Sequence, residues 1–129
     1  MKIESMDDVA RIVMHGFPEE AKRAEARRVL SRYGLQSFHP ELPRVWAACL
    51  KVADGQLDRL EETVAIACRD YRDMLCLAEC PEQTAQPELR ESDPAKYAQL
   101  AESDRLQYAG WVARMKRMPE ASAEGSSFP

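Results

Sequence analysis

The densest cluster of side chains that could do chemistry is the run Arg69-Asp70-Tyr71-Arg72-Asp73. Asp70 and Asp73 are three positions apart, so on a helix their carboxylates lie about 60° apart around the axis. Two carboxylates so placed could bind a cation or orient a water molecule. The same run also permits ordinary surface ion pairs, because Arg69 and Asp73 are four positions apart. The pattern therefore allows a catalytic, a partner-binding and a purely structural interpretation.

Two further residues extend this candidate site. Glu79 lies near the end of the same predicted helix, and Arg44 lies near the start of an earlier one. A bidentate pair between Arg44 and a carboxylate would be charge-assisted and would join two helices. Spacing alone leaves open whether such a pair forms or whether these residues only decorate the surface. The residues of the candidate interaction or structural motif are Arg44, Asp70, Arg72, Asp73 and Glu79.

The four cysteines are Cys49, Cys68, Cys76 and Cys80, and all lie in strongly helical stretches among apolar residues. Reduced core cysteines have such surroundings. A thiolate zinc site needs four converging ligands, and the usual short spacing on a turn is missing. Cys76 and Cys80 are poor disulfide partners, because adjacent turns of a helix hold their side chains parallel. We expect four free thiols, with Cys49 and Cys68 buried, and no metal site.

The other residues with chemical potential are isolated. His15 and His39 fall at predicted helix ends or in loops, without a nearby pattern that indicates a catalytic triad. Asp104 falls on the inward side of the last predicted helix, where an unpaired carboxylate would cost several kcal/mol. We expect Asp104 to pair with an arginine or to lie at a gap between helices. No catalytic residue set or cofactor-binding motif is recognisable, so the sequence favours a protein that is not an enzyme without deciding the question.

Helical periodicity must position these residues, and no stretch alternates as a half-buried strand would. The residues 81–93 contain two prolines and predict a loop. The predicted helices cover about 6–15, 18–33, 42–53, 57–79 and 94–117. The predicted core comprises Val45, Trp46, Leu50, Leu60, Val64, Tyr71, Leu75, Leu100, Trp111 and Val112. We expect an all-α, four- or five-helix bundle-like single domain over 1–118, followed by a disordered tail over 119–129.

Composition narrows the classes of partner. The 129 residues are 45% hydrophobic and carry a net charge of −4, which disfavours nucleic acid and anionic membranes as partners of the whole chain. No apolar run approaches the roughly 20 residues of a membrane-spanning helix, and no signal peptide is recognisable. We therefore expect a cytoplasmic protein. One basic stripe, typical of a solvated helix face, comprises Lys22, Arg23, Arg27, Arg28 and Arg32.

Residues between 44 and 112 follow a recognisable order. The segments are Arg44-Val45, Leu50-Lys51, Ala53-Asp54-Gly55, Leu57, Leu60, Asp70-Tyr71-Arg72-Asp73, Ala78-Glu79, Pro81, Asp104-Arg105, Gln107-Tyr108 and Trp111. This order resembles a group of small uncharacterised bacterial helical proteins with the patterns R-V-x(4)-L-K-L-A-x-G-x-L, D-Y-R-D-V-L, A-E-Y-P and D-x-x-Q-Y-x-x-W. The chain departs from them at Cys80, where the group has an aromatic residue, and at Met74, where it often has valine. The resemblance implies an all-helical fold and brings no established activity, cofactor or partner. Because it places Arg44 and the acids near Asp70 in one shared pattern, it also leads us to expect one cross-helix pair between them.

Together these observations favour a non-enzymatic interaction module whose protein partner, unknown from sequence, docks near Asp70, Asp73 and Glu79. The alternative is a small helical enzyme or metal-binding protein that uses these carboxylates, although bundle metal sites use a Glu-x-x-His pair that this chain lacks. A third hypothesis is nucleic-acid binding through the basic stripe. The sequence also leaves a homodimer open.

Overall fold

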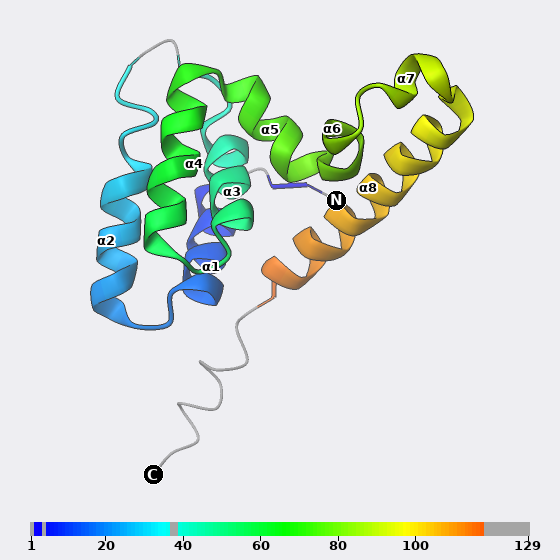
Figure 1. Ribbon diagram of the computed structural model, residues 1–129. Coiled ribbons are helices and arrows are strands. Elements are labelled where there is room, and N and C mark those ends of the chain that lie inside the picture. Colours follow the sequence, from blue (N-terminus) through cyan, green and yellow to red (C-terminus); the bar gives the residue numbers. More distant parts are fainter. Residues whose placement is uncertain (1, 4, 37–38, 118–129) are drawn as a thin grey trace.

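The computed structural model describes residues 2–3, 5–36 and 39–117, and in these ranges it contains eight helices and no strand (Figure 1). The prediction of an all-α fold is therefore confirmed. The helices are α1 (Met6–Gly16), α2 (Glu20–Leu30), α3 (Leu42–Ala53), α4 (Leu57–Arg69), α5 (Tyr71–Glu79), α6 (Pro81–Ala85), α7 (Leu89–Ser92) and α8 (Pro94–Met115). The predicted tail over 119–129 lies outside the described residues.

The centre of the molecule is α3, which packs against α1, α4 and α5. Its sequence is apolar almost all round, as expected of a helix that is covered on most sides. The small side chains of Ala47, Ala48 and Ala53 are fully buried and allow neighbouring helices to approach closely. The helix α2 then packs on α4, which closes a bundle of the first five helices (Figure 1).

Most of the predicted core is buried. Three of its aromatic residues, Trp46, Tyr71 and Trp111, are only partly buried and pack against the edge of the core. Trp46 keeps its polar atom satisfied there, because its Nε1 donates a hydrogen bond to the carbonyl of Tyr33 at 2.9 Å. The residues confirmed as buried are Val45, Leu50, Leu60, Val64, Leu75, Leu100 and Val112.

The prediction of one helix over 57–79 was wrong, because the chain breaks at Asp70. This residue is extended, with φ −158° and ψ 104°, and its side chain accepts a hydrogen bond from the backbone N–H of Arg72 at 3.0 Å. Asp70 thus acts as the N-cap of α5 and satisfies a donor that the first turn of a helix leaves without a partner. The break lets α5 leave α4 in a new direction (Figure 1).

The prediction of a loop over 81–93 was also wrong, because this segment contains the short helices α6 and α7. Both helices pack along the first half of α8. The expected start of α8 is confirmed, since the Asp93 side chain accepts from the N–H of Lys96 at 3.1 Å and Pro94 opens the helix. We call α6, α7 and the part of α8 from Pro94 to Asp104 the arm, which projects from the bundle (Figure 1).

Asp104 holds the arm together. Its side chain is buried, and its two oxygens accept hydrogen bonds from the backbone N–H groups of Glu82 at 3.0 Å and Gln83 at 3.1 Å. These donors belong to the first turn of α6, whose own N-cap, Cys80, forms no side-chain cap. The expected arginine partner was wrong, because backbone donors from a neighbouring helix compensate the buried carboxylate instead. The alternative, a gap between helices, agrees with a hollow of about 360 Å³ that Asp104 lines beside α8.

The second half of α8 is fastened to the bundle by polar contacts. Lys51 of α3 donates from Nζ to Oε1 of Gln107 at 3.1 Å and lies 6.0 Å from the centroid of the Trp111 ring. At the end of α8, Lys116 pairs with Asp8, and Nε2 of His15 donates to the carbonyl of Arg117 at 2.8 Å. Across the described residues no helix is long and apolar enough to span a membrane.

Replacement of Asp104 by alanine should lower the free energy of unfolding by about 2–4 kcal/mol, because two backbone N–H groups lose their acceptor. Urea denaturation monitored by circular dichroism measures this loss. The control is Ser103→Ala, which alters an exposed residue of the same helix and should stay within about 0.5 kcal/mol of the wild type. Equal stability of the Asp104 and Ser103 variants would contradict the capping role.

Candidate functional site

A groove with a volume of about 360 Å³ follows one face of α5. Its α5 residues recur in adjacent pairs four positions apart, which places them on a single side of the helix. The start of α3 forms the opposite side. We call this feature the α5 groove, and its lining residues are Tyr71, Arg72, Leu75, Cys76, Glu79 and Cys80 from α5 with Glu41 and Arg44.

Three other hollows adjoin the α5 groove through shared lining residues. The largest of the three, about 620 Å³, shares Arg44 and Glu79 with the groove and is also lined by Ile3 and Tyr108. A hollow of about 360 Å³ against α8 also shares Glu79. At the opposite end, a hollow of about 270 Å³ shares Tyr71. The α5 groove therefore lies between neighbouring hollows, and the residues that it shares with them form walls common to both.

An ion pair between Arg44 and Glu79 spans the α5 groove. Nε of Arg44 donates to Oε2 of Glu79 at 2.7 Å, and Nη2 donates to Oε1 at 2.6 Å, so the pair is bidentate. Nη1 of the same guanidinium also donates to Glu41 at 3.3 Å. The hydrogen bonds to Glu79 are the main cause of a raised pKa for Arg44. The expected cross-helix pair is thus present.

Local structure explains why these two residues meet. Arg44 lies in the first turn of α3, and its side chain is not fully buried there. Glu79 is the last residue of α5, where the negative end of the helix dipole disfavours a carboxylate. The guanidinium offsets this unfavourable position. The side chain of Glu79 is only 18% exposed, against 42% for Arg44, so the carboxylate depends on its partner more strongly.

The structure does not bring the other candidate residues into this pair. The carboxylate of Asp70 is used within its own turn, where the hydrogen bond from the N–H of Arg72 is the main cause of a lowered pKa. Arg72 and Asp73 are both exposed. Of the three carboxylates, only Glu79 bonds to another helix. The predicted motif is therefore divided between a helix cap and a cross-helix pair.

The chain matches no known family model, and no curated protein or solved structure matches it either.

One aromatic residue of the site was not predicted from the sequence. Tyr108 separates the hollow beside Ile3 from the hollow against α8, and it lines both. The pKa of Tyr108 lies well above its usual range, mainly because the residue is buried and secondly because the negative charge of Glu79 is nearby. Its hydroxyl therefore stays protonated and can donate. The sequence places Tyr108 on the apolar side of the last predicted helix, but position along a helix gives no signal of a cavity.

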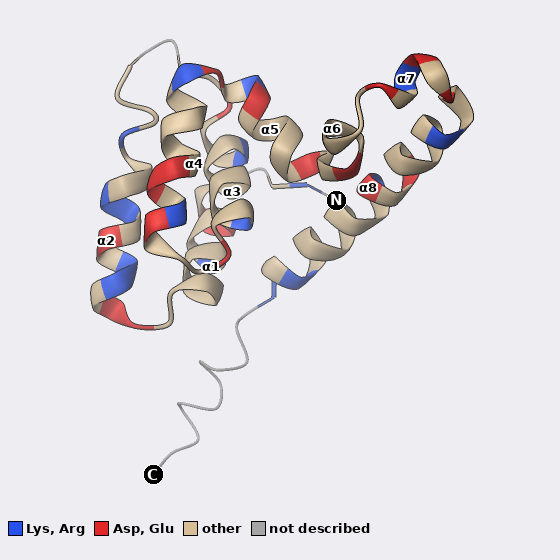
Figure 2. Cartoon of the chain, viewed as in Figure 1, with Lys and Arg blue, Asp and Glu red and all other residues tan. Residues whose placement is uncertain are grey.

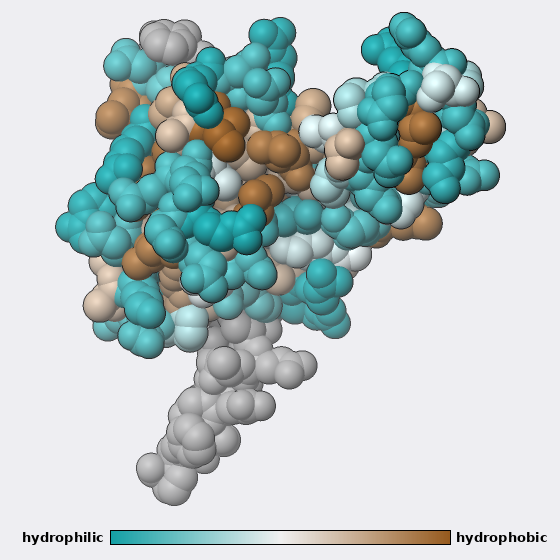
Figure 3. Space-filling view, in the orientation of Figure 1, coloured by the Kyte–Doolittle hydropathy of each residue, from teal (hydrophilic) through white to brown (hydrophobic). Residues whose placement is uncertain are grey.

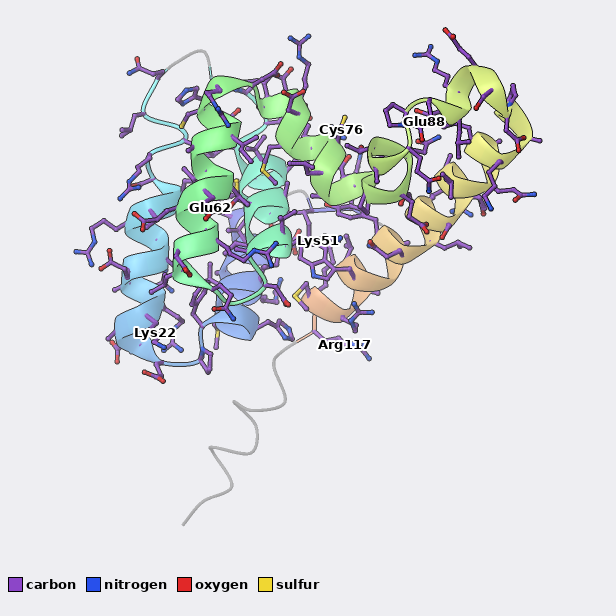
Figure 4. The ribbon with its side chains drawn as sticks, in the orientation of Figure 1. Lys22, Lys51, Glu62, Cys76, Glu88 and Arg117 are labelled. Atoms are coloured by element: carbon purple, nitrogen blue, oxygen red, sulfur yellow. The ribbon has the colours of Figure 1, made fainter. Side chains whose placement is uncertain are left out.

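The cysteines are all free thiols, as expected, but their burial differs from the prediction. Cys49 is buried in α3, which raises its pKa to about 12. Cys68 is exposed, because the α4 stripe on which it was placed ends one residue later. Cys76 projects outward from α5 (Figure 4). Within the described ranges, no group of three or more histidine, cysteine or acidic side chains is placed to hold a metal ion.

The basic stripe on α2 is largely engaged by nearby acceptors. Arg28 pairs with Glu25 at 2.6 Å, and Arg32 pairs with Glu61 of α4 at 3.2 Å. The guanidinium of Arg23 donates to the carbonyls of Phe17 and Pro18. Figure 2 shows acidic and basic residues interspersed along α2 and α4. The α2 surface therefore lacks the single sign of charge that a phosphate backbone would favour.

Replacement of Glu79 by alanine should lower the free energy of unfolding by about 1–2 kcal/mol. Loss of an exposed ion pair costs up to about 1 kcal/mol, and loss of one partner of a buried pair costs about 3–5 kcal/mol. The Arg44–Glu79 pair is half-buried, so we expect a loss between these values. Chemical denaturation measures the loss. Glu41→Ala is the control, since this exposed glutamate shares the guanidinium and should cost under about 0.5 kcal/mol. A loss for Glu79→Ala no larger than the control would show that the pair is not structural.

A thiol reagent added to the native protein should label Cys68 and Cys76 first, because both are exposed. Cys49 should react only after unfolding, since burial removes access and disfavours its thiolate. Mass spectrometry of the labelled peptides measures the order. Labelling of Cys49 at the rate of Cys76 would contradict the packing of α3.

Proposed function

We propose that the protein is a non-enzymatic interaction module that binds a short segment of a partner protein in the α5 groove. The observation that carries this proposal is the groove itself, which follows a whole helix face and shares lining residues at both ends with further hollows. An elongated depression of this kind suits a chain segment better than a compact small molecule.

The lining supports binding through apolar contact. Tyr71, Leu75 and Cys76 supply apolar surface, and the charges beside them are already compensated. Arg44 is paired with Glu79 and Glu41, while Arg72 is 3.4 Å from the carboxylate of Asp70. Figure 3 shows apolar surface gathered around α5 between the bundle and the arm, with hydrophilic surface around it. A partner segment with apolar side chains is therefore favoured.

The length of the groove limits the segment. A helix of the length of α5 spans about 14 Å, and an extended chain covers that distance with about four residues. Such a segment would bury less surface than a standard stable interface, which favours a weak and reversible complex. The adjoining hollows allow contact beyond these residues.

The other hypotheses receive less support from the site. The carboxylates of Asp70 and Asp104 are both occupied by backbone N–H groups, so neither is available to a metal ion without loss of a helix cap. Arg28 and Arg32, which would contact nucleic acid, are paired with glutamates.

Peptides selected from a displayed random library against the wild-type protein should carry apolar residues, and Cys76→Glu should weaken their binding at least about tenfold. The reason is that the new carboxylate must lose its hydration beneath an apolar segment. Fluorescence anisotropy with labelled peptides measures the affinity.

Leu77→Glu is the matched control. Leu77 is the next residue of α5, is 37% exposed and is not part of the groove lining, so this variant should bind as the wild type does. Circular dichroism must show both variants folded. Equal weakening by both substitutions, or selected peptides without apolar residues, would contradict binding in the α5 groove.

A further inference from the structure

The connection between α2 and α3 is held by contacts around His39. Nδ1 of His39 accepts a hydrogen bond from the backbone N–H of Gly34 at 2.8 Å. The imidazole also stacks on the ring of Tyr33, with centroids 4.4 Å apart and planes inclined by 13°. Tyr33 is itself buried, and its hydroxyl donates to the carbonyl of Pro40 at 2.7 Å. His39 is thus the point at which the two ends of this connection meet.

The hydrogen-bond role of His39 fixes its protonation state. A backbone N–H can only donate, so Nδ1 must be the unprotonated nitrogen, and the neutral ring carries its proton on Nε2. Uptake of a second proton would place a donor opposite the N–H of Gly34. The bond would then be replaced by a repulsive contact between two donors.

The other histidine of the chain has the opposite role. Nε2 of His15 faces the carbonyl oxygen of Arg117 at 2.8 Å, and a carbonyl can only accept. This nitrogen therefore carries a proton, and an additional proton on the other ring nitrogen leaves the bond intact. The two histidines should respond to acid in different ways, although the ring bonds to Gly34 and Arg117 have the same length of 2.8 Å.

We propose that His39 is an acid-sensitive switch whose protonation breaks the Gly34–His39 contact and leaves the His15–Arg117 contact in place. The switch does not depend on the proposed function. It does bear on the same surface, because His39 and Tyr33 form one wall of the 270 Å³ hollow that adjoins the α5 groove. Loss of the Gly34 bond removes one of the contacts that hold this wall at the Tyr71 end of the groove.

Charges around the hollow influence the protonated ring. The end of α4 contributes Arg69 and the thiol of Cys68, and α5 contributes Arg72 and the phenol of Tyr71. Asp70 lies between the two helices, and its carboxylate already accepts from Arg72. The guanidinium groups repel an imidazolium, whereas Asp70 and the face of the Tyr33 ring attract it. Release from Gly34 must therefore prevail over the residual stacking on Tyr33.

The test is an NMR titration of the full chain. The ring signals of both histidines and the backbone amide of Gly34 are followed from neutral to acidic pH, and hydrogen exchange is expressed as a protection factor to remove its intrinsic pH dependence. We expect the Gly34 signal to follow the titration curve of the His39 ring, with its protection falling about tenfold. The carbonyl carbon signal of Arg117, followed in the same titration, should keep its hydrogen-bonded position as the His15 ring signals change.

The matched variant is His39→Asn, because the asparagine oxygen can accept from Gly34 but does not titrate in this range. It should keep the neutral-pH position of the Gly34 signal and abolish its pH response. A Gly34 amide that does not move while His39 titrates would overturn the proposal. An equal response in His39→Asn, or a parallel change at Arg117, would also overturn it by indicating general acid loosening.

Discussion

Almost every side of α3 must be covered, and this requirement organises the rest of the molecule. Full burial of a valine or leucine side chain is worth about 1.5–3 kcal/mol, so Val45 and Leu50 strongly favour neighbours on opposite sides of the helix. The alanines between them leave room for backbones rather than for side chains. The helices α1, α4 and α5 supply these neighbours.

Burial of α3 confines its charges to its ends, where they join other helices. Arg44 in the first turn reaches Glu79 of α5, and Lys51 in the last turn reaches Gln107 of α8. Asp104 of α8 in turn occupies the exposed donors of α6. The ends of α3 are thus joined to other helices by side chains from distant parts of the sequence, and Asp104 caps α6 from a distance, whereas the adjacent residues Asp70 and Asp93 cap α5 and α8. The α5 groove exists because Arg44 and Glu79 hold two such ends together without filling the space beside them.

Periodicity predicted the elements that have one uninterrupted apolar stripe. The bounds of α3 agree with the prediction, and α8 begins at the Asp93-Pro94 signal. The break at Asp70 was missed because the apolar positions continue in phase through Tyr71 and Leu75. A local signal was present, since Asp70 with Asp73 three residues later has the form of an N-cap with an acid in the first turn.

Other features had no signal in the sequence. The contact of Asp104 with Glu82 and Gln83 spans more than twenty positions and depends on how α6 lies against α8. The exposure of Cys68 follows from where α4 ends, and periodicity alone does not define helix ends. The α5 groove is a surface that none of the other described helices covers. Whether a surface stays uncovered depends on how all the helices pack, which the local sequence does not determine. The residues of the candidate motif were therefore easier to predict than their roles.

The extended residue Asp70 also bears on how this fold tolerates change in chain length. In a continuous helix, one inserted residue rotates every later side chain by about 100° around the axis. A rigid rod over 57–79 would turn Glu79 away from Arg44 after any such insertion. Because the helical path is interrupted and started again at Asp70, a length change in α4 can be absorbed at the junction. The helical register of α5 is thus independent of the register of α4. The position of Glu79 around the helix axis therefore follows from the register of α5.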